Sequence, residues 1–195
     1  MADPIEVLDY WLGQVGPAGW YAAGDALDAD IRDTFGDVWQ AALDGGLDHW
    51  VDGTVGTLAY LILCDQFSRN MHRGNALAFA TDARALAAAR TAIAQGWDLN
   101  APEPERQFFY MPFEHSEHAD DQAMAVQLLT ERLASDPEMA LHARAHQQVI
   151  AQYGRFPGRN AALGRVSSTA EAEFIERGGY GGLIAAIKAS HAASA

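Results

Sequence analysis

The chain has 195 residues and a mass of 21.0 kDa, enough to bury a substantial hydrophobic core in one domain of ordinary size. Its 13 basic and 26 acidic residues give a formal net charge of −13. That charge excludes a nonspecific DNA or RNA binder, which needs basic side chains against the phosphates. The charge is uneven, because residues 1–65 carry 12 acidic residues and one basic residue, whereas residues 66–195 carry 14 and 12.

Targeting signals and disulfides are not expected. The first ten residues lack the basic and apolar stretches of a signal peptide, and no run reaches the ~18 apolar residues of a membrane helix. The single cysteine, Cys64, allows no intrachain disulfide and lies in an apolar run, which is typical of a core thiol. We therefore expect a soluble cytoplasmic protein that binds neither a membrane nor nucleic acid.

Helical signals dominate the N-terminal half. Asp3-Pro4 predicts a helix start, and this helix is expected to stop near Gly13. A second helix is expected over 25–43, with aspartates on its solvated face and an apolar stripe formed by Leu27, Ile31, Phe35 and Val38. A third, over 54–67, is apolar nearly all round, so we expect it at the centre of the fold, followed by a polar loop at 68–75.

The C-terminal half continues the pattern. Gly96 is the expected C-cap of an Ala-rich helix, Pro112 is expected to end or kink a helix, and Gly178 to Gly182 reads as a flexible connector. The remaining expected helices span 81–95, 103–110, 120–135, 137–153 and 168–177, and a last one follows Gly182. Because no stretch alternates like a strand, the sequence predicts a single all-α domain, an antiparallel array of about eight or nine helices over 1–195.

Three polar segments interrupt the apolar helices. The first is DQFSRN at 65–70, followed by His72 and Arg73; the second is FEHSEH at 113–118; the third is GRFPGRN at 154–160, which His146 precedes by two helical turns. Asp65 and Arg69 are four residues apart, a spacing that makes an ion pair on a helix. Trp20-Tyr21, between two glycines, is the aromatic pair best placed to line the mouth of a pocket.

Long strings in the chain resemble the bacterial proteins grouped as the domain-of-unknown-function 924 family. They are VLDYWLG, LILCDQFSRNMHRGNALAFATD, GWD, ERQFFYMPFEHSE and HQQVIAQYGRFPGRNAALGRVSS, and the resemblance runs from Val7 to the region of Thr169. Two positions depart from the family pattern: Ser68 replaces a usual Pro, and Gly158 replaces a frequent His. The second departure removes an imidazole, which weakens any mechanism that needs a base at that position.

The resemblance implies a tetratricopeptide-like fold of helical repeats and no activity, since the family has no established biochemical role. Its recurring segments imply that one region gathers the candidate site residues. The candidate ligand-binding residues are Asp65, Gln66, Arg69, Asn70, His115, His146, Arg155, Arg159 and Asn160, and the catalytic candidates are Glu114 and His115.

The residues leave three functions open. The first is a pocket for a small anionic molecule or an acidic peptide end, since arginine forks match carboxylate and phosphate groups. The second is a small hydrolase with Glu114 or His115 as general base. The third is a purely structural polar network. No Glu-x-x-His or His-Glu-x-x-His motif, P-loop or dinucleotide fingerprint occurs, so we expect neither a metal site nor a cofactor.

Overall fold

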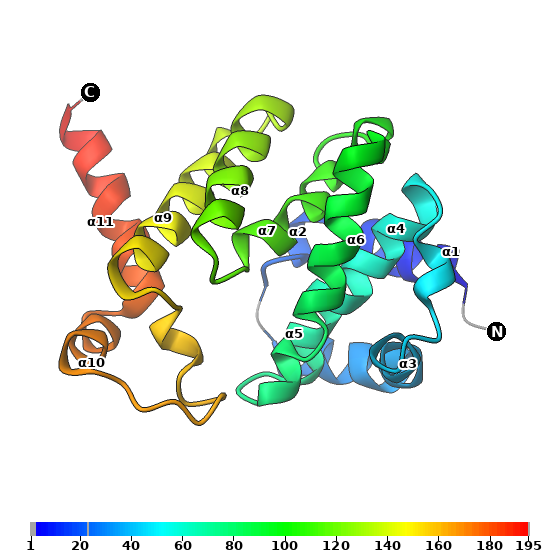
Figure 1. Cartoon of the computed structure of the whole chain (residues 1–195), viewed down its shortest axis with the longest axis horizontal. Coiled ribbons are helices and arrows are strands. Elements are labelled where there is room, and N and C mark those ends of the chain that lie inside the picture. The colour runs from blue at the N-terminus through cyan, green and yellow to red at the C-terminus, as the bar shows by residue number, and fades with distance from the viewer. Residues whose placement is uncertain (1–2, 23, 195) are drawn as a thin grey trace. The chain divides into compact units, whose positions relative to one another are not determined.

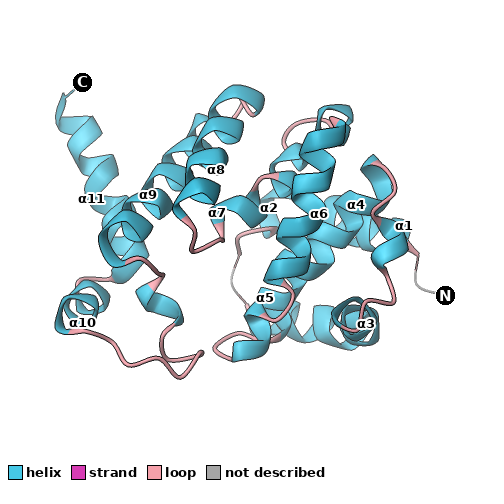
Figure 2. Cartoon of the chain, viewed as in Figure 1, coloured by secondary structure: helices cyan, strands magenta, loops and turns pink. Residues whose placement is uncertain are grey.

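The computed structural model, which describes residues 3–22 and 24–194, is built from helices (Figures 1 and 2). Helices make up 76% of the described residues, which contain no strand, and this confirms the all-α class. Eight α-helices within those ranges have five residues or more, and short α-helical, 3₁₀ and π-helical segments join them. By its internal contacts the chain divides into two compact units, residues 1–113 and residues 114–195.

The first unit contains six α-helices in its described part. They are α1 (Pro4–Leu8), α2 (Gly16–Gly19), α3 (Asp25–Leu43), α4 (Thr54–Leu61), α5 (Ser68–Met71) and α6 (Asp82–Gln95). Two π-helical turns connect α1 to α2 and α4 to α5, namely η1 (Asp9–Val15) and η3 (Ile62–Phe67). The 3₁₀ turns are η2 (Asp48–Trp50), η4 (Ala76–Phe79), η5 (Trp97–Asn100) and η6 (Glu105–Phe109), and α7 (Met111–Glu114) crosses the boundary between the units.

The core of the first unit forms around α4 and η3. Every residue from 57 to 68 is buried, as the apolar run on all faces of this helix predicted. Three rings surround Phe67 at centroid distances of 5.9, 5.3 and 4.9 Å, those of Tyr10, Trp11 and Phe35. This aromatic packing fixes the C-terminal end of η3, where the polar segment begins.

Two helices of this unit run further than the sequence predicted. Gly13 does not stop the first one, which continues as the π turn η1 and ends at Gly16, whose φ of 65° favours glycine. Residues 68–71, expected in a loop, continue the central helix as α5. In both places the helix continues through or after a π turn. The burial of neighbouring side chains outweighs the weak helix preference of Gly13 and Asn70.

Helix α3 has the predicted bounds but a different buried face. Its inward residues are Asp28, Ile31, Phe35, Trp39 and Ala42. Asp28 was expected on the solvated face with the other aspartates; instead it is 6% exposed. It belongs to the same helical stripe as Ile31 and Phe35, three and seven residues away.

The second unit is formed by α8 (Ala119–Arg132), α9 (Pro137–Tyr153), η7 (Pro157–Arg159), α10 (Thr169–Glu176) and α11 (Gly179–Ser194). A four-residue connection returns α9 beside α8, so the two form an antiparallel hairpin (Figure 1). A small core closes the other side of α9, where Val149, Ile150 and Phe156 meet partly buried Tyr153, Phe174 and Leu183.

The residues that cap several helices were predicted correctly. Gly96 and Gly154 end α6 and α9 in the left-handed conformation, and the Ser168 hydroxyl and Glu171 carboxylate form a capping box that starts α10. Two other predictions were wrong. Residues 105–109 form a 3₁₀ turn where a helix over 103–110 was expected, and α8 ends at Arg132 rather than at residue 135. The 3₁₀ turn does end before Pro112, which lies in the first turn of the separate short helix α7.

The glycine-rich stretch at 178–182 is not a connector, because α11 begins at Gly179. Gly178 and Gly179 have φ values of 94° and 56°, which turn the chain from α10 into α11. A Cβ on Gly182 would overlap the carbonyl oxygen of Arg177, so this position needs glycine for a close approach of backbone. No helix in the described part of the chain is both long and apolar enough to span a membrane.

Candidate functional site

The first unit has a small polar pocket where α2 ends and α5 begins. Its volume is about 160 Å³, and it is lined by Trp20, Tyr21, Ala22, Gln66, Arg69, Asn70 and Arg73. Ligand pockets usually measure ~300–1,000 Å³, so only a small molecule fits here. Three predicted binding residues and the predicted aromatic pair therefore converge on one cavity.

The π turn η3 places Asp65 and Gln66 next to each other, and Gln66 lines the pocket. The Gln66 Nε2 donates to Asp65 Oδ2 at 2.6 Å, and both side chains are buried. The Cys64 carbonyl in the same turn accepts the Thr81 hydroxyl at 2.5 Å, which satisfies a backbone acceptor inside the core. Turns of this kind occur often at functional sites.

Arg69 is held on several sides. Its guanidinium lies 2.8 Å from Asp82 Oδ1 and 3.7 Å from Asp65 Oδ1, donates to the Ala78 carbonyl, and lies 4.7 Å from the Phe79 ring centroid. The predicted pair of Asp65 and Arg69 is thus present, and Asp82 is a partner that the sequence did not suggest. Only 22% of the Arg69 side chain is exposed.

Asp28 holds two of the residues that line the pocket, Asn70 and Arg73. It accepts Asn70 Nδ2 at 2.8 Å and Arg73 Nε and Nη2 at 2.8 and 2.9 Å. The bidentate bond from Arg73 lowers the pKa of Asp28, with a smaller contribution from Asn70. Arg73 itself is 54% exposed.

Several polar atoms of these lining residues have no hydrogen-bond partner in the described ranges. The acceptors are Gln66 Oε1 and Asn70 Oδ1, and the donors are Arg69 Nε and Arg73 Nη1. The pocket residues therefore carry both donors and acceptors beside an exposed guanidinium.

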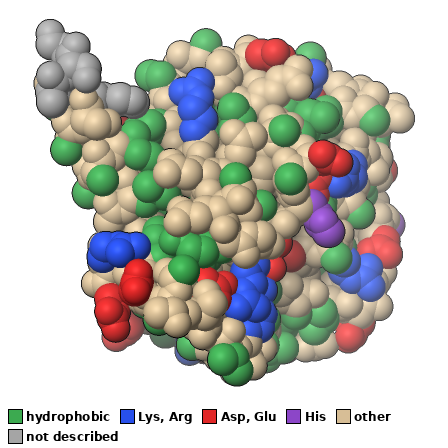
Figure 3. All heavy atoms as spheres, turned by 60° about the vertical axis from the view of Figure 1, so that its left-hand side comes forward, with side chains coloured by type: hydrophobic (Ala, Val, Ile, Leu, Met, Phe, Trp, Pro, Cys, Tyr) green, Lys and Arg blue, Asp and Glu red, His purple; other side chains and the backbone are tan. Residues whose placement is uncertain are grey.

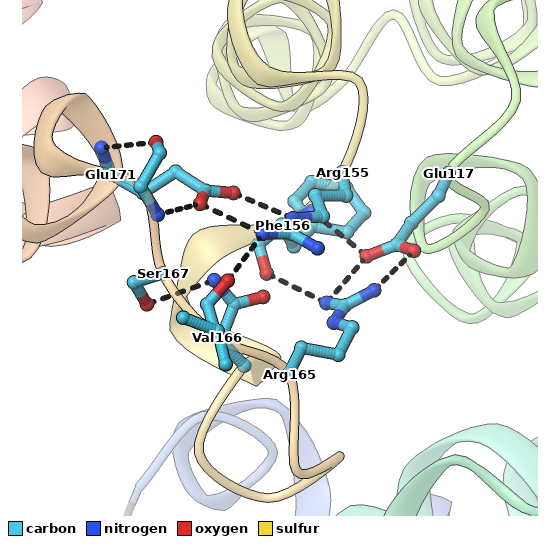
Figure 4. A network of polar contacts seen from close by, with 9 residues as sticks. Glu117, Arg155, Phe156, Arg165, Val166, Ser167 and Glu171 are labelled. Atoms are coloured by element: carbon cyan, nitrogen blue, oxygen red, sulfur yellow. Dashed lines mark hydrogen bonds and ion pairs between the residues drawn. The ribbon is translucent and has the colours of Figure 1, made fainter.

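In the second unit, one of the two predicted arginines, Arg155, takes part in an ion pair, and Arg165, which was not among the predicted site residues, forms another (Figure 4). Arg155 forms a bidentate pair with Glu171 at 2.6 and 2.8 Å and also donates to the Val166 carbonyl. Arg155 and the backbone N–H of Ser168 hold the pKa of Glu171 well below its usual range. The pair ties the start of α10 to the end of α9.

A second pair joins the loop after η7 to the segment before α8. Arg165 binds both oxygens of Glu117 at 2.8 and 3.0 Å, and Glu117 also accepts the Phe156 N–H at 2.8 Å (Figure 4). Burial raises the pKa of Glu117, but the bonds from Arg165 and Phe156 outweigh it and lower the value.

Figure 3 shows acidic and basic side chains interspersed on the face drawn there.

Arg159 and Asn160 also have partners within the unit. The guanidinium of Arg159 lies 4.5 Å from the Phe156 ring centroid and donates to the His115 carbonyl at 2.8 Å. The Asn160 amide is 1% exposed and donates to Ser167 Oγ at 3.0 Å. These contacts hold the turn η7 against neighbouring segments of the same unit.

Glu114 and His146 form a close pair. Glu114 Oε1 lies 2.5 Å from His146 Nδ1, and the rings of His115 and His146 lie edge to face at 6.2 Å. His142, expected to point to solvent, instead contacts the Tyr180 hydroxyl at 2.6 Å through Nδ1. Tyr180 was not predicted, because its glycine-rich surroundings carried no helix signal.

The predicted site residues fall into two groups. Asp65, Gln66, Arg69 and Asn70 belong to the first unit, and Glu114, His115, His146, Arg155, Arg159 and Asn160 to the second. The three-segment region remains a prediction. Among the residues that the structure describes, no group of three or more His, Cys, Asp or Glu is arranged to hold a metal ion.

Comparison with known proteins identifies a family whose function is unknown. No curated protein matches the chain. The structure of a protein of unknown function, ATU0120 from Agrobacterium tumefaciens, is similar at 35% identity with a TM-score of 0.84, over 89% of this chain and 97% of that one. Residues 7–179 match the family model described as bacterial protein of unknown function (DUF924). The chain therefore belongs to the DUF924 family of bacterial proteins.

Proposed function

We propose that the first unit is a binding module for a small molecule with one carboxylate, or for the acidic end of a peptide. The supporting observation is the polar pocket beside Arg73, whose guanidinium is half-exposed and has a free edge at Nη1 within the described structure. A carboxylate that accepts from this edge would not need to displace Asp28. The size of the pocket favours a ligand of amino-acid dimensions over a nucleotide.

The charge balance around the pocket favours a single negative charge on the ligand. The carboxylates of Asp28, Asp65 and Asp82 lie against the guanidiniums of Arg69 and Arg73, so a doubly charged phosphate would meet more repulsion here than a single carboxylate would. The open acceptors on Gln66 and Asn70 favour a ligand that also donates hydrogen bonds, such as an ammonium or amide group.

The experiment is a calorimetric titration with small carboxylates chosen by a thermal-shift screen, each compared with its neutral amide. Arg73→Gln should weaken carboxylate binding at least tenfold, or about 1.4 kcal/mol, and leave amide binding nearly unchanged. Arg84→Gln is the matched control, because Arg84 forms an ion pair with Asp48 outside the pocket. Equal affinity for acid and amide, or an unaffected Arg73→Gln variant, would contradict the proposal.

A structural role fits one predicted site residue better than ligand binding. The guanidinium of Arg155 donates hydrogen bonds to Glu171 and to the Val166 carbonyl. These bonds hold Glu171, which is part of the capping box of α10. We therefore propose that Arg155 belongs to a structural network of the second unit. Arg155→Gln should lower the melting temperature without changing carboxylate affinity.

A further inference from the structure

The buried carboxylate of Glu114 has one described partner. Its side chain is 3% exposed, and Oε1 lies 2.5 Å from His146 Nδ1, while Oε2 is buried and accepts no hydrogen bond from any described residue. A carboxylate removed from water needs a nearby group that compensates its charge, and the His146 ring lies beside it. The short approach to Nδ1 places the negative charge where it favours a proton on that nitrogen.

The opposite ring nitrogen is left open by this arrangement. His146 Nδ1 also lies 3.1 Å from the His142 carbonyl oxygen, a second acceptor that keeps a hydrogen on Nδ1. Nε2 has no partner in the described ranges, and 19% of the side chain is exposed. With the proton fixed on Nδ1, the lone pair of the neutral ring lies on Nε2.

Three aromatic neighbours hold the ring in place. Tyr180 stacks on it at 4.3 Å and 25°, Phe156 meets it edge-on at 5.4 Å, and the His115 ring lies 6.2 Å away. Burial and the charge of Glu114 raise the pKa of Tyr180, so its phenol stays protonated against His142. The titratable groups around His146 are thus Glu114, His115, His142 and Tyr180, and none of them hydrogen-bonds to Nε2.

We propose that His146 Nε2 is the general base of a hydrolytic site for small carboxylic esters, with Glu114 as its positioning residue. An imidazole whose Nδ1–H is held by a carboxylate and whose Nε2 is accessible is the arrangement that activates water or a hydroxyl in acyl transfer. The geometry assigns the base to His146, rather than to Glu114 or His115, which the sequence suggested. The proposal is independent of ligand binding in the first unit.

The proton and electron pairs balance in two steps. Water gives a proton to Nε2 while its oxygen bonds to the acyl carbon, and the carbonyl π pair moves to oxygen. The tetrahedral species then re-forms the carbonyl, the bond to the alcohol oxygen breaks, and that oxygen takes the proton from Nε2. Ester and water become acid and alcohol, and the Glu114 carboxylate stabilises the transient imidazolium.

The test is hydrolysis of p-nitrophenyl acetate by the full chain. His146→Asn keeps a donor for Glu114 but removes Nε2, so kcat/KM should fall by about 100-fold. His118→Asn, at an exposed histidine, is the matched control and should change nothing. Glu114→Gln should lower kcat and leave KM nearly unchanged, because the imidazolium formed in the reaction loses its neighbouring carboxylate while the substrate contacts remain.

Two results would overturn the proposal. One is a wild-type rate no higher than that of His146→Asn, or a loss with His115→Asn that His146→Asn does not share. The other comes from the unmodified protein and needs no variant to fold: long-range ¹H–¹⁵N spectra should show His146 protonated at Nδ1 and bare at Nε2. The opposite tautomer would remove the base from the open side of the ring.

Discussion

Asp28 and Asp65 are the two buried acidic residues among the first 65, and each contacts an arginine that lines the pocket. The other ten acidic residues of that segment are exposed. Net charge therefore describes the surface of this region, while two inward carboxylates set the electrostatics of its pocket. A count of acidic residues does not distinguish an exposed aspartate from a buried one that holds a pocket arginine.

Replacing Asp28 with Asn should destabilise the protein in a pH-dependent way. The pKa of Asp28 is lowered in the folded state, so its stabilisation is complete above the unfolded value near 4 and disappears as pH falls through the folded value. We expect a loss of about 1–2 kcal/mol at pH 7, kept small by the half-exposed Arg73. Urea melts from pH 7 to pH 3 measure it.

The control for this change is Asp33→Asn, on the exposed face of the same helix. It should cost less than about 0.5 kcal/mol. A gap between Asp28→Asn and wild type that persists unchanged at pH 3 would mean that packing, not the charge, accounts for the loss.

Cys64 should be inert in the native protein. The thiol is fully buried, and burial raises its pKa, so the thiolate that reacts with disulfide reagents is scarce. We expect no reaction with Ellman's reagent over hours under native conditions and one equivalent released in denaturant. Rapid native labelling would show that the core around η3 opens locally.

At the scale of single elements, two neighbouring glycines of α11, Gly181 and Gly182, offer a matched comparison. A Cβ at Gly182 would overlap the Arg177 carbonyl, whereas a Cβ at Gly181 would meet nothing within 4 Å. Gly182→Ala should destabilise the protein by about 1–3 kcal/mol through overpacking. Gly181→Ala should stabilise it by about 0.5–1 kcal/mol, because alanine favours helix. Thermal melts of both variants settle the sign, and equal shifts would refute the close approach at Gly182.

Local chemistry explains which elements the sequence could predict. The bounds 25–43 and 137–153 and the capping box at Ser168 follow from caps and periodicity, which are contained in a few neighbouring residues. The π turns have no such signal, because they depend on packing with distant residues. The same holds for Tyr180, whose stacking on His146 joins residues 34 positions apart.

The candidate site was predicted in part. Gln66, Arg69 and Asn70 line a real pocket with Trp20 and Tyr21, so a polar string after an apolar helix was a useful signal. The sequence did not indicate two acidic partners of these residues, Asp28 and Asp82. Asp28 could have been predicted, since its spacing of three and seven residues from Ile31 and Phe35 places it on the buried stripe.

For the whole molecule, the net charge of −13 governs long-range encounters. The ten exposed acidic residues of the N-terminal third form a field that repels polyanions. We expect no binding to a labelled 20-base-pair duplex in fluorescence anisotropy at 50 mM salt, at any concentration up to 100 μM. Salt-sensitive binding there would contradict this expectation and point to a basic patch.

The π turn η3 also determines where the chain tolerates a change of length. Deleting one residue within Ile62–Phe67 would let hydrogen bonding return to the α pattern, so the helix from Thr54 to Met71 would survive. Because the wide π turn takes up one extra residue, the side chains after the deletion would keep nearly the same direction around the helix axis. Arg69 and Asn70 would therefore stay at the pocket wall, whereas a deletion in the regular α-helical part, Thr54–Leu61, would rotate every following residue by about 100°. The π turn is thus the part of this helix that can lose a residue without losing the binding surface.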